Sequence, residues 1–195
     1  MSEDKTTLAG CSFSIHPMSD NFIELITNAL ENTNSSKVWM QTDKVSTIVR
    51  GRMAHIFDVS QSVFAQTAQS GKHVAFHATY SIGCSGDSEG HSYMAESDEL
   101  MNNTENKELS LDVAAKFALY PMDGGDYMDT IYEQIENMKS FGVEVTPTHY
   151  ETRLDGKSHD IFKGLYSVFQ ETKEAGSNHT VMTVSISANS PTQES

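Results

Sequence analysis

Short stretches of alternating apolar and polar residues open each half of the chain and predict β-strands. In the first stretch, residues 11–16, every second side chain is apolar, and Pro17 ends the pattern. Ser19 and Asp20 are good helix N-caps, and the apolar residues after them recur at helical spacing. The other elements expected in this half are strands at 38–41 and 45–50, a helix with Ile56, Val59, Val63 and Phe64 on its inner face, and a strand at 74–82 with Val74, Phe76, Ala78, Tyr80 and Ile82 inward.

The same series of elements occurs again about 104 residues later. The segment 13–18 returns as 117–122, the segment 55–57 returns as 160–162, and the segment 79–82 returns as 183–186, all in the same order. Several matches in one order indicate a duplication, and a repeat of this kind fixes the architecture of the whole chain. The second copy supplies Asp126 as a helix cap, strands at 143–147 and 149–154, and a helix stripe of Ile161, Leu165, Val168 and Phe169.

The order β-α-β-β-α-β, found twice, predicts an α+β protein made of tandem ferredoxin-like repeats. Each repeat should form an antiparallel four-stranded sheet with both helices on one face. The expected boundaries are 6–84 for the first repeat, 85–109 for a linker and 110–190 for the second repeat. The linker is polar and long for a loop, and packing of Tyr93 is expected to order part of it.

The sheet face that carries no helix is expected to be mixed in polarity and poor in charge. Such a face suits packing against another sheet, within the chain or between two chains, with polar groups left to meet a ligand. The residues assigned to it are Ser12, Ser14, His16, Thr47, His77, Thr79 and Ser81 in the first repeat and Tyr120, Val181, Thr183 and Ser185 in the second.

The chain is strongly acidic, with a net charge of −14. This charge repels phosphate backbones and anionic lipid, so nucleic acid is not an expected partner. The N-terminus does not resemble a signal peptide and no apolar run is long enough to span a bilayer, so a cytoplasmic location is expected.

No group of residues demands catalysis. His73 and His77 lie four apart on an expected strand, too far apart to share a metal ion. Cys11 and Cys84 could approach on neighbouring strands, but most simply they are small core residues. We therefore expect no catalytic residues, no metal and no cofactor.

The most informative feature is a duplicated set of polar residues on strands. Thr47 and Thr152 are equivalent, and so are Ile15 and Leu119, each of which precedes a Pro-Met pair that breaks strand pairing. Free main-chain groups and a threonine hydroxyl could hydrogen-bond the edge of a flat heterocycle. Stacking surface is expected from Trp39, Tyr80 and Tyr120.

These residues resemble those of the YkoF-type thiamine- and hydroxymethylpyrimidine-binding proteins over nearly the whole chain. The segments that carry the resemblance include Phe13–Met18, Ser46–Thr47, Arg50–Gly51, Tyr80–Cys84, Phe117–Met122, Leu154–Gly156 and Ser187–Pro191.

The resemblance implies a homodimer that holds one pyrimidine-bearing ligand in each repeat and serves a membrane transport system for the thiamine precursor. Carried over by position, the contacts are Ile15 and Thr47 in the first site and Leu119 and Thr152 in the second. Two differences separate the sites: Glu151 stands where the first repeat has Ser46, and Tyr120 stands where it has His16.

Two other classes of function remain open at this stage. Dimeric ferredoxin-like chains also include monooxygenases and isomerases, so the fold does not exclude an enzyme. A regulatory module that senses a metabolite and acts on a partner protein is the other alternative.

Overall fold

The computed structural model describes residues 8–83, 89–122 and 127–192. Cys84 and Asp126, which the sequence suggested as a core thiol and a helix cap, lie outside these ranges. The first repeat contains β1 (Ala9–Pro17), α1 (Phe22–Asn32), β2 (Trp39–Thr42), β3 (Thr47–Gly51), α2 (Met53–Ala68) and β4 (Val74–Ile82). The second contains β5 (Asp112–Pro121), α4 (Tyr127–Met138), the 3₁₀ turn η2 (Lys139–Phe141), β6 (Glu144–Pro147), β7 (Thr152–Lys157), α5 (Ser158–Glu174) and β8 (Thr180–Ala188).

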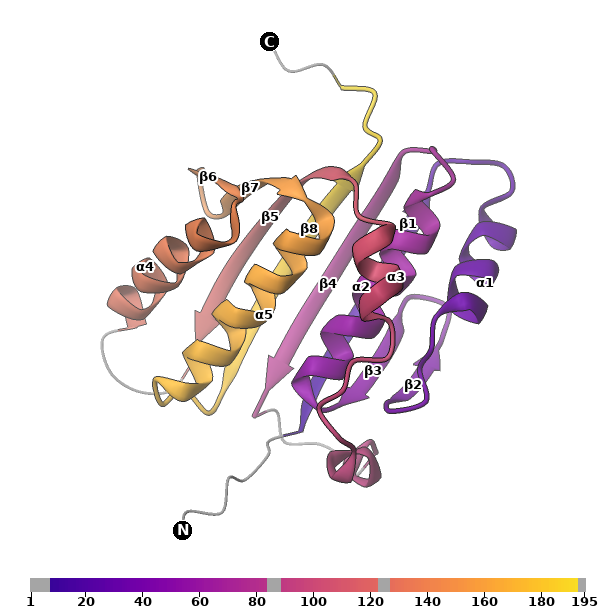
Figure 1. Ribbon diagram of the computed structural model, residues 1–195. Helices are drawn as coiled ribbons and strands as arrows, with labels where there is room; N and C mark the ends of the chain where they lie inside the picture. Colours follow the sequence, from indigo (N-terminus) through magenta and orange to yellow (C-terminus); the bar gives the residue numbers. More distant parts are fainter. Residues whose placement is uncertain (1–7, 84–88, 123–126, 193–195) are drawn as a thin grey trace.

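Each repeat has the predicted β-α-β-β-α-β order and an antiparallel four-stranded sheet. The two sheets join along β4 and β8 into one eight-stranded sheet of order β2-β3-β1-β4-β8-β5-β7-β6 (Figure 1). The expectation that two sheets of one chain would pack face to face is therefore wrong. Within its own repeat, each of the last strands, β4 and β8, has one edge without a neighbouring strand. Pairing these two edges gives hydrogen-bond partners to the main-chain N–H and C=O groups of both strands.

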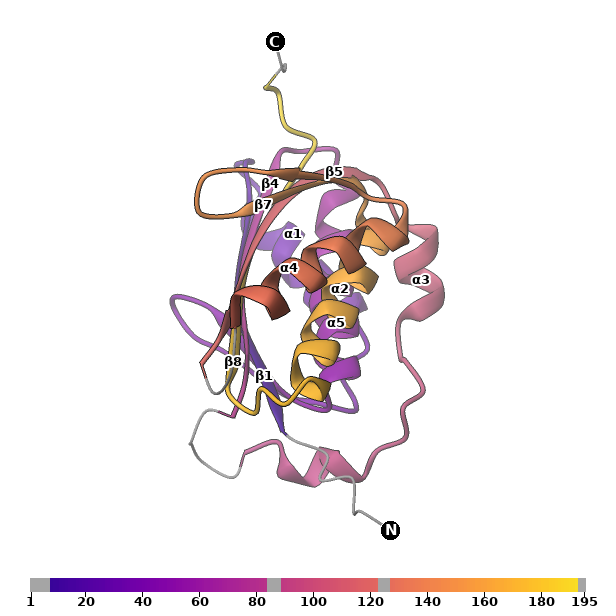
Figure 2. The same ribbon diagram turned by 90° about the vertical axis from the view of Figure 1, so that its left-hand side faces the viewer.

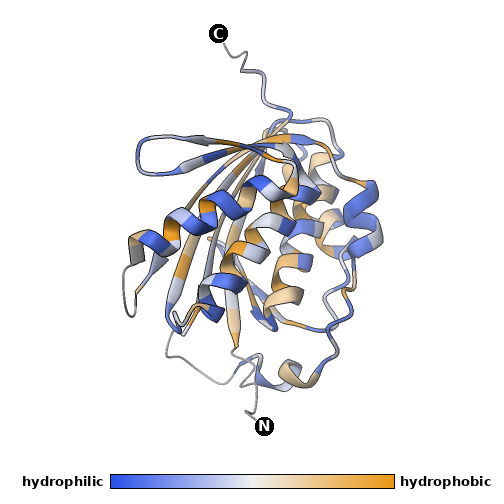
Figure 3. Cartoon of the chain, turned by 60° about the vertical axis from the view of Figure 1, so that its left-hand side comes forward, coloured by the Kyte–Doolittle hydropathy of each residue, from blue (hydrophilic) through white to orange (hydrophobic). Residues whose placement is uncertain are grey.

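Helices α1, α2, α4 and α5 cover one face of this sheet, and within the described residues no helix lies on the opposite face (Figure 2). The covered face supplies the core, with Phe13, Phe76, Tyr80, Phe162 and Phe169 almost fully buried. The apolar positions predicted for β4, Val74 to Ile82 at every second residue, all point into this core. In Figure 3 the helices carry hydrophobic and hydrophilic residues on different sides, as expected of helices that pack on a sheet.

The connection between the repeats is partly helical. It contains the 3₁₀ turn η1 (His91–Ala95), which includes Tyr93, and the short helix α3 (Asn103–Glu108). Helix α3 lies on the outer side of the helix layer, against α2 (Figure 2). The linker therefore forms a third layer over part of the molecule.

Two local expectations differ from the structure. The N-cap position of α1 is Asn21, not Ser19 or Asp20, and its side chain makes no capping hydrogen bond; Asn21 Oδ1 instead accepts a hydrogen bond from the Ser19 hydroxyl at 2.5 Å. The strands expected from residues 45 and 149 begin later, at Thr47 and Thr152, because the preceding residues form turns. No described helix is both long and apolar enough to cross a membrane.

Candidate functional site

Strand β1 loses one of its two neighbours before it ends. Its pairing with β4 continues to Pro17, whereas its pairing with β3 stops at Phe13, which lies opposite Thr47. The β3 ladder therefore does not extend over residues 14–17, so the break in pairing lies on one side of the strand and begins before the Pro-Met pair at which the sequence placed it. Main-chain groups on this side of the strand are available to a ligand.

Strand β5 repeats this arrangement. It pairs with β8 as far as Pro121, but its pairing with β7 stops where Phe117 meets Thr152. The same geometry thus occurs at the same place in both repeats, as the duplication requires.

Thr47 and Thr152 stand at the ends of these shortened ladders. They are 6% and 7% exposed. Because each lies opposite a buried phenylalanine in an antiparallel pair, both face the helix-covered side of the sheet. The assignment of Thr47 to the open face is therefore wrong. Val49, two residues after Thr47 in β3, is buried against the helices. Because residues two apart in a strand point to the same face, Thr47 also faces the helices.

Ile15 and Leu119 lie on the same covered face, two residues beyond the phenylalanines that oppose the threonines. They are 8% and 5% exposed. The structure therefore brings Ile15 together with Thr47, and Leu119 together with Thr152, in two equivalent groups.

The two threonines differ in their hydrogen-bonding partners. Thr47 Oγ1 lies 2.9 Å from Thr42 Oγ1 on the adjacent strand β2. The residue that faces Thr152 from β6 is Pro147, which has no hydroxyl. The hydrogen-bonding capacity next to the threonine is consequently not the same in the two repeats.

A carboxylate fixes the turn that leads into Thr47. Asp43 Oδ1 accepts hydrogen bonds from the main-chain N–H groups of Val45 and Ser46, at 2.7 and 2.9 Å. These bonds, that from Ser46 first, hold the pKa of Asp43 below its ordinary value. These two hydrogen bonds therefore stabilise the conformation of the turn while the Asp43 carboxylate is charged.

Four of the other predicted residues lie on the open face. Ser46 accepts a hydrogen bond from the Ser12 hydroxyl at 3.1 Å, and Trp39 pairs with Arg50 across β2 and β3. His16 and Tyr120 are exposed on this side. The sheet itself separates these four residues from Ile15, Thr47, Leu119 and Thr152.

Tyr80 is a core residue and not a stacking surface for a ligand. Its side chain is fully buried, its hydroxyl lies 2.8 Å from Ser60 Oγ, and its ring stacks on Phe57 with centroids 4.1 Å apart. The sequence assigned it both an inward position and a ligand contact, and only the first is correct. Cys11, opposite Tyr80 on β1, is equally buried, and burial raises the pKa of its thiol far above the ordinary value.

The open face contains two shallow depressions. One, of about 340 Å³, has hydroxyl groups of β1, β4 and β8 around it, with His77. The other, of about 800 Å³, extends from His77 across β8 and β5 to β7 and includes Lys116, Arg153 and Asp155. Sequence reasoning did not select Lys116 or Arg153, because their location beside Asp155 depends on how β5, β7 and β8 pair.

Comparison with known proteins gives one family. The sequence model of the YKOF-related family matches residues 8–87 and again residues 112–193. A protein of Bacillus subtilis (strain 168), named "Putative HMP/thiamine-binding protein YkoF", is 41% identical over 187 residues, which cover 96% of this chain and 93% of that protein.

Among solved structures the similarities are distant. A hypothetical protein from Methanocaldococcus jannascii aligns with 43% of this chain and 87% of its own, at 18% identity and a TM-score of 0.39. The regulatory subunit of aspartate kinase from Thermus flavus aligns with 85% of this chain and 94% of its own, at 7% identity and a TM-score of 0.22.

Proposed function

Because the chain belongs to the YKOF-related family, we propose that it binds thiamine or its hydroxymethylpyrimidine precursor without changing it, one molecule in each repeat. The observation that carries this proposal is the duplicated strand end, where a buried threonine lies beside main chain that the neighbouring strand leaves unpaired. The Bacillus subtilis relative, whose name describes a putative HMP/thiamine-binding protein, supports the choice of ligand.

The chemistry of the ligand fits such a strand end. An aminopyrimidine presents hydrogen-bond donors and acceptors along one edge, and free main-chain N–H and C=O groups beside a hydroxyl can pair with both kinds. The apolar side chains of Ile15 and Leu119 supply contact for the ring in their repeats. Small-molecule sites usually combine an apolar lining with a few placed polar groups of this kind.

Calorimetric titration with thiamine and with hydroxymethylpyrimidine tests the proposal. We expect two bound molecules per chain and dissociation constants in the micromolar range or below, since ligands of this size reach roughly −8 kcal/mol. The two sites should differ in affinity, because Thr47 shares its hydroxyl with Thr42 whereas Thr152 faces Pro147. Absence of both heat and a thermal shift at saturating ligand would rule the proposal out.

Single substitutions assign the sites. Thr47→Val and Thr152→Val keep the side-chain shape and remove one hydroxyl, so each should weaken one of the two sites by about tenfold. Thr104→Val, exposed on α3 and away from both strand ends and the open sheet face, serves as the matched control and should leave both sites unchanged. Equal effects of all three substitutions would place the ligand elsewhere.

Binding without turnover distinguishes this function from an enzyme of the same fold. Mass spectrometry of thiamine after long incubation with the protein should recover it intact. Formation of a product in proportion to the amount of protein would overturn this part of the proposal.

We further propose that the chain acts as a homodimer whose open sheet faces pack together, and that it delivers its ligand to a membrane uptake system. The helix-free face, mixed in polarity, supports the first part. Sedimentation should give a dimer, and Thr183→Glu on β8 should produce monomers. Ligand-dependent co-purification with a membrane transporter tests the second part.

A further inference from the structure

The helix layer contains a cavity that is separate from both strand ends. It has a volume of about 500 Å³ and lies where α2 of the first repeat meets α5 of the second, with α3 at its rim. Both walls come from equivalent positions, offset by 105 residues. The equivalent pairs on its walls include Phe57 with Phe162, Asp58 with Lys163, and Gln61 with Tyr166.

The floor of this cavity is aromatic. Phe57 and Phe162 are buried, and the half-buried Tyr166 packs edge-on against Phe57 with ring centroids 5.7 Å apart. Aromatic surfaces of this kind favour a flat ring, which can stack on one of them or meet its edge.

Asn106, one of the residues that line the cavity, has a buried hydrogen-bond acceptor. Asn106 is 2% exposed, and its Nδ2 donates to the main-chain oxygen and to Oδ1 of Asp58, both at 3.1 Å. Because both partners are acceptors, the amide orientation is fixed and Asn106 Oδ1 is left without a partner among the described residues. Buried polar atoms are nearly always satisfied, so this position calls for an N–H or O–H donor.

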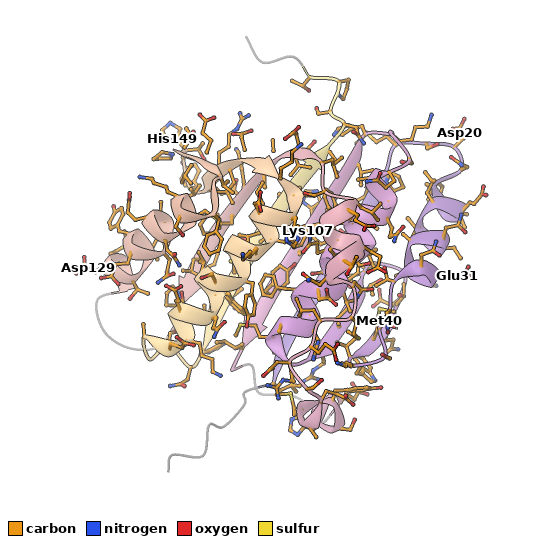
Figure 4. The ribbon with its side chains drawn as sticks, in the orientation of Figure 1. Asp20, Glu31, Met40, Lys107, Asp129 and His149 are labelled. Atoms are coloured by element: carbon orange, nitrogen blue, oxygen red, sulfur yellow. The ribbon has the colours of Figure 1, made fainter. Side chains whose placement is uncertain are left out.

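Two lysines and two aspartates line the cavity. Lys107 and Lys163 both line it and are exposed, and neither forms an ion pair among the residues that the structure describes. Figure 4 places Lys107 on α3, in front of the helix layer where α2 and α5 lie. The carboxylates at the cavity are already engaged, Asp58 by Asn102 and Asn106 and Asp98 by Arg52.

His159, which also lines the cavity, has a lowered pKa mainly because it is partly buried. Burial lowers its pKa, and the charges of Lys163 and Lys107 act in the same direction, against Asp160. Its Nδ1 lies 3.1 Å from Gln61 Nε2 and accepts a hydrogen bond from that amide, which links the two walls. The polar wall is therefore held in place before any ligand arrives.

We propose that this cavity binds a small planar aromatic acid that also carries a hydrogen-bond donor. The acid group pairs with Lys107 and Lys163, the ring packs on the half-buried Tyr166 in front of the buried Phe57 and Phe162, and the donor satisfies Asn106 Oδ1. Since both repeats build the cavity, each chain holds one such ligand, whereas the vitamin sites number one per repeat. A ligand here binds both repeats at once and stabilises their contact.

The probe that tests this is 4-aminobenzoate, which has a flat ring, an acid group and an amino donor. In the ¹⁵N-labelled full chain it should give saturable shifts of the side-chain amides of Gln61 and Asn106. Benzoate, which lacks the donor, and aniline, which lacks the acid, should each bind on the order of tenfold more weakly. Equal binding of all three compounds, or no saturable shift, would overturn the proposal.

Charge variants at the rim add a second measurement. Lys163→Gln and Lys107→Gln change exposed side chains and should each weaken the binding of 4-aminobenzoate by a few fold, while Lys72→Gln, exposed beyond the end of α2, should not. Thiamine titrations of the same variants should match the unmodified protein, which separates this site from the vitamin sites. Unchanged binding of 4-aminobenzoate in the Lys107 and Lys163 variants would contradict the proposal.

Discussion

Asp58 fastens the linker to the helix layer through a single buried carboxylate. Its Oδ2 accepts hydrogen bonds from the main-chain N–H groups of Met101 and Asn102, each at 3.0 Å, and from Asn102 Nδ2 at 2.8 Å. Asn102 in turn exchanges hydrogen bonds with the main chain of Asn34, at 2.8 and 2.9 Å. One residue on α2 thereby connects the linker to the end of α1 as well.

The charge state of Asp58 should make stability depend on pH. Burial raises its pKa above the ordinary value of 3.8, against opposing hydrogen bonds from Asn102 and Met101 and the charge of His55. The folded chain therefore holds this proton more tightly than the unfolded chain, so the contribution is complete below the unfolded pKa and is lost as pH rises through the folded pKa.

Comparison with Asp58→Asn measures this contribution. The free energy of unfolding of the unmodified protein, minus that of the variant, should fall as pH rises from about 4 to about 7. Urea unfolding at several pH values measures the difference, and Asp129→Asn, an exposed carboxylate on α4, is the control. A difference that grows with pH would mean that the hydrogen bonds favour the charged form more than burial opposes it.

At the scale of elements, α4 and α5 approach closely where α5 has no side chain. A Cβ atom built on Gly164 would collide with the sulfur of Met138, and would lie 3.3 Å from the ring of Phe141. Met138 is fully buried and cannot swing into solvent. The glycine is therefore required by packing between the helices, although it lowers the intrinsic stability of α5.

Gly164→Ala tests whether packing outweighs helix propensity. Alanine gains up to about 1 kcal/mol in a helix, whereas overpacking a tight contact costs about 1–3 kcal/mol. We expect a net loss of about 1–2 kcal/mol in the free energy of unfolding, measured by urea denaturation. Adding Met138→Ala should make Gly164→Ala favourable, and a Gly164→Ala variant as stable as the parent would refute the steric argument.

For the whole molecule, the two repeats share one core. Rings from opposite repeats pack together at centroid distances of 5.9 to 6.1 Å, in the pairs Phe64–Phe162, Phe76–Phe162 and Phe57–Phe169. The β4–β8 pairing continues the sheet across the same boundary. Each repeat therefore buries part of its aromatic surface against the other.

The chain should therefore unfold in one cooperative transition despite its two repeats. Calorimetry should give a ratio of calorimetric to van't Hoff enthalpy near one, since no unit remains folded when its neighbour is lost. A fragment of residues 1–90 alone should fail to form a stable monomer. Two resolved transitions, or a folded monomeric fragment, would show that the repeats are independent domains.

What the sequence determined by itself is the local structure and its duplication. Strand and helix periods depend on neighbouring residues only, so the β-α-β-β-α-β order, the inward series from Val74 to Ile82 and the equivalence of Thr47 with Thr152 could all be read directly. The ends of the β3 and β7 ladders, at Phe13 and Phe117, are instead set by where β3 and β7 begin, since pairing with β4 and β8 continues as far as Pro17 and Pro121.

Only the tertiary structure decided which faces and edges meet. Strand β3 begins two residues later than expected, so that Thr47 stands at the end of the ladder opposite the buried Phe13, and the ring of Phe57 stacks on Tyr80 within the core. The joining of β4 to β8, the anchoring of the linker by Asp58 and the cavity between α2 and α5 all depend on contacts between residues that lie far apart in the chain. Such contacts depend on how the two repeats pack against each other, and the spacing of apolar residues along the chain does not specify that packing.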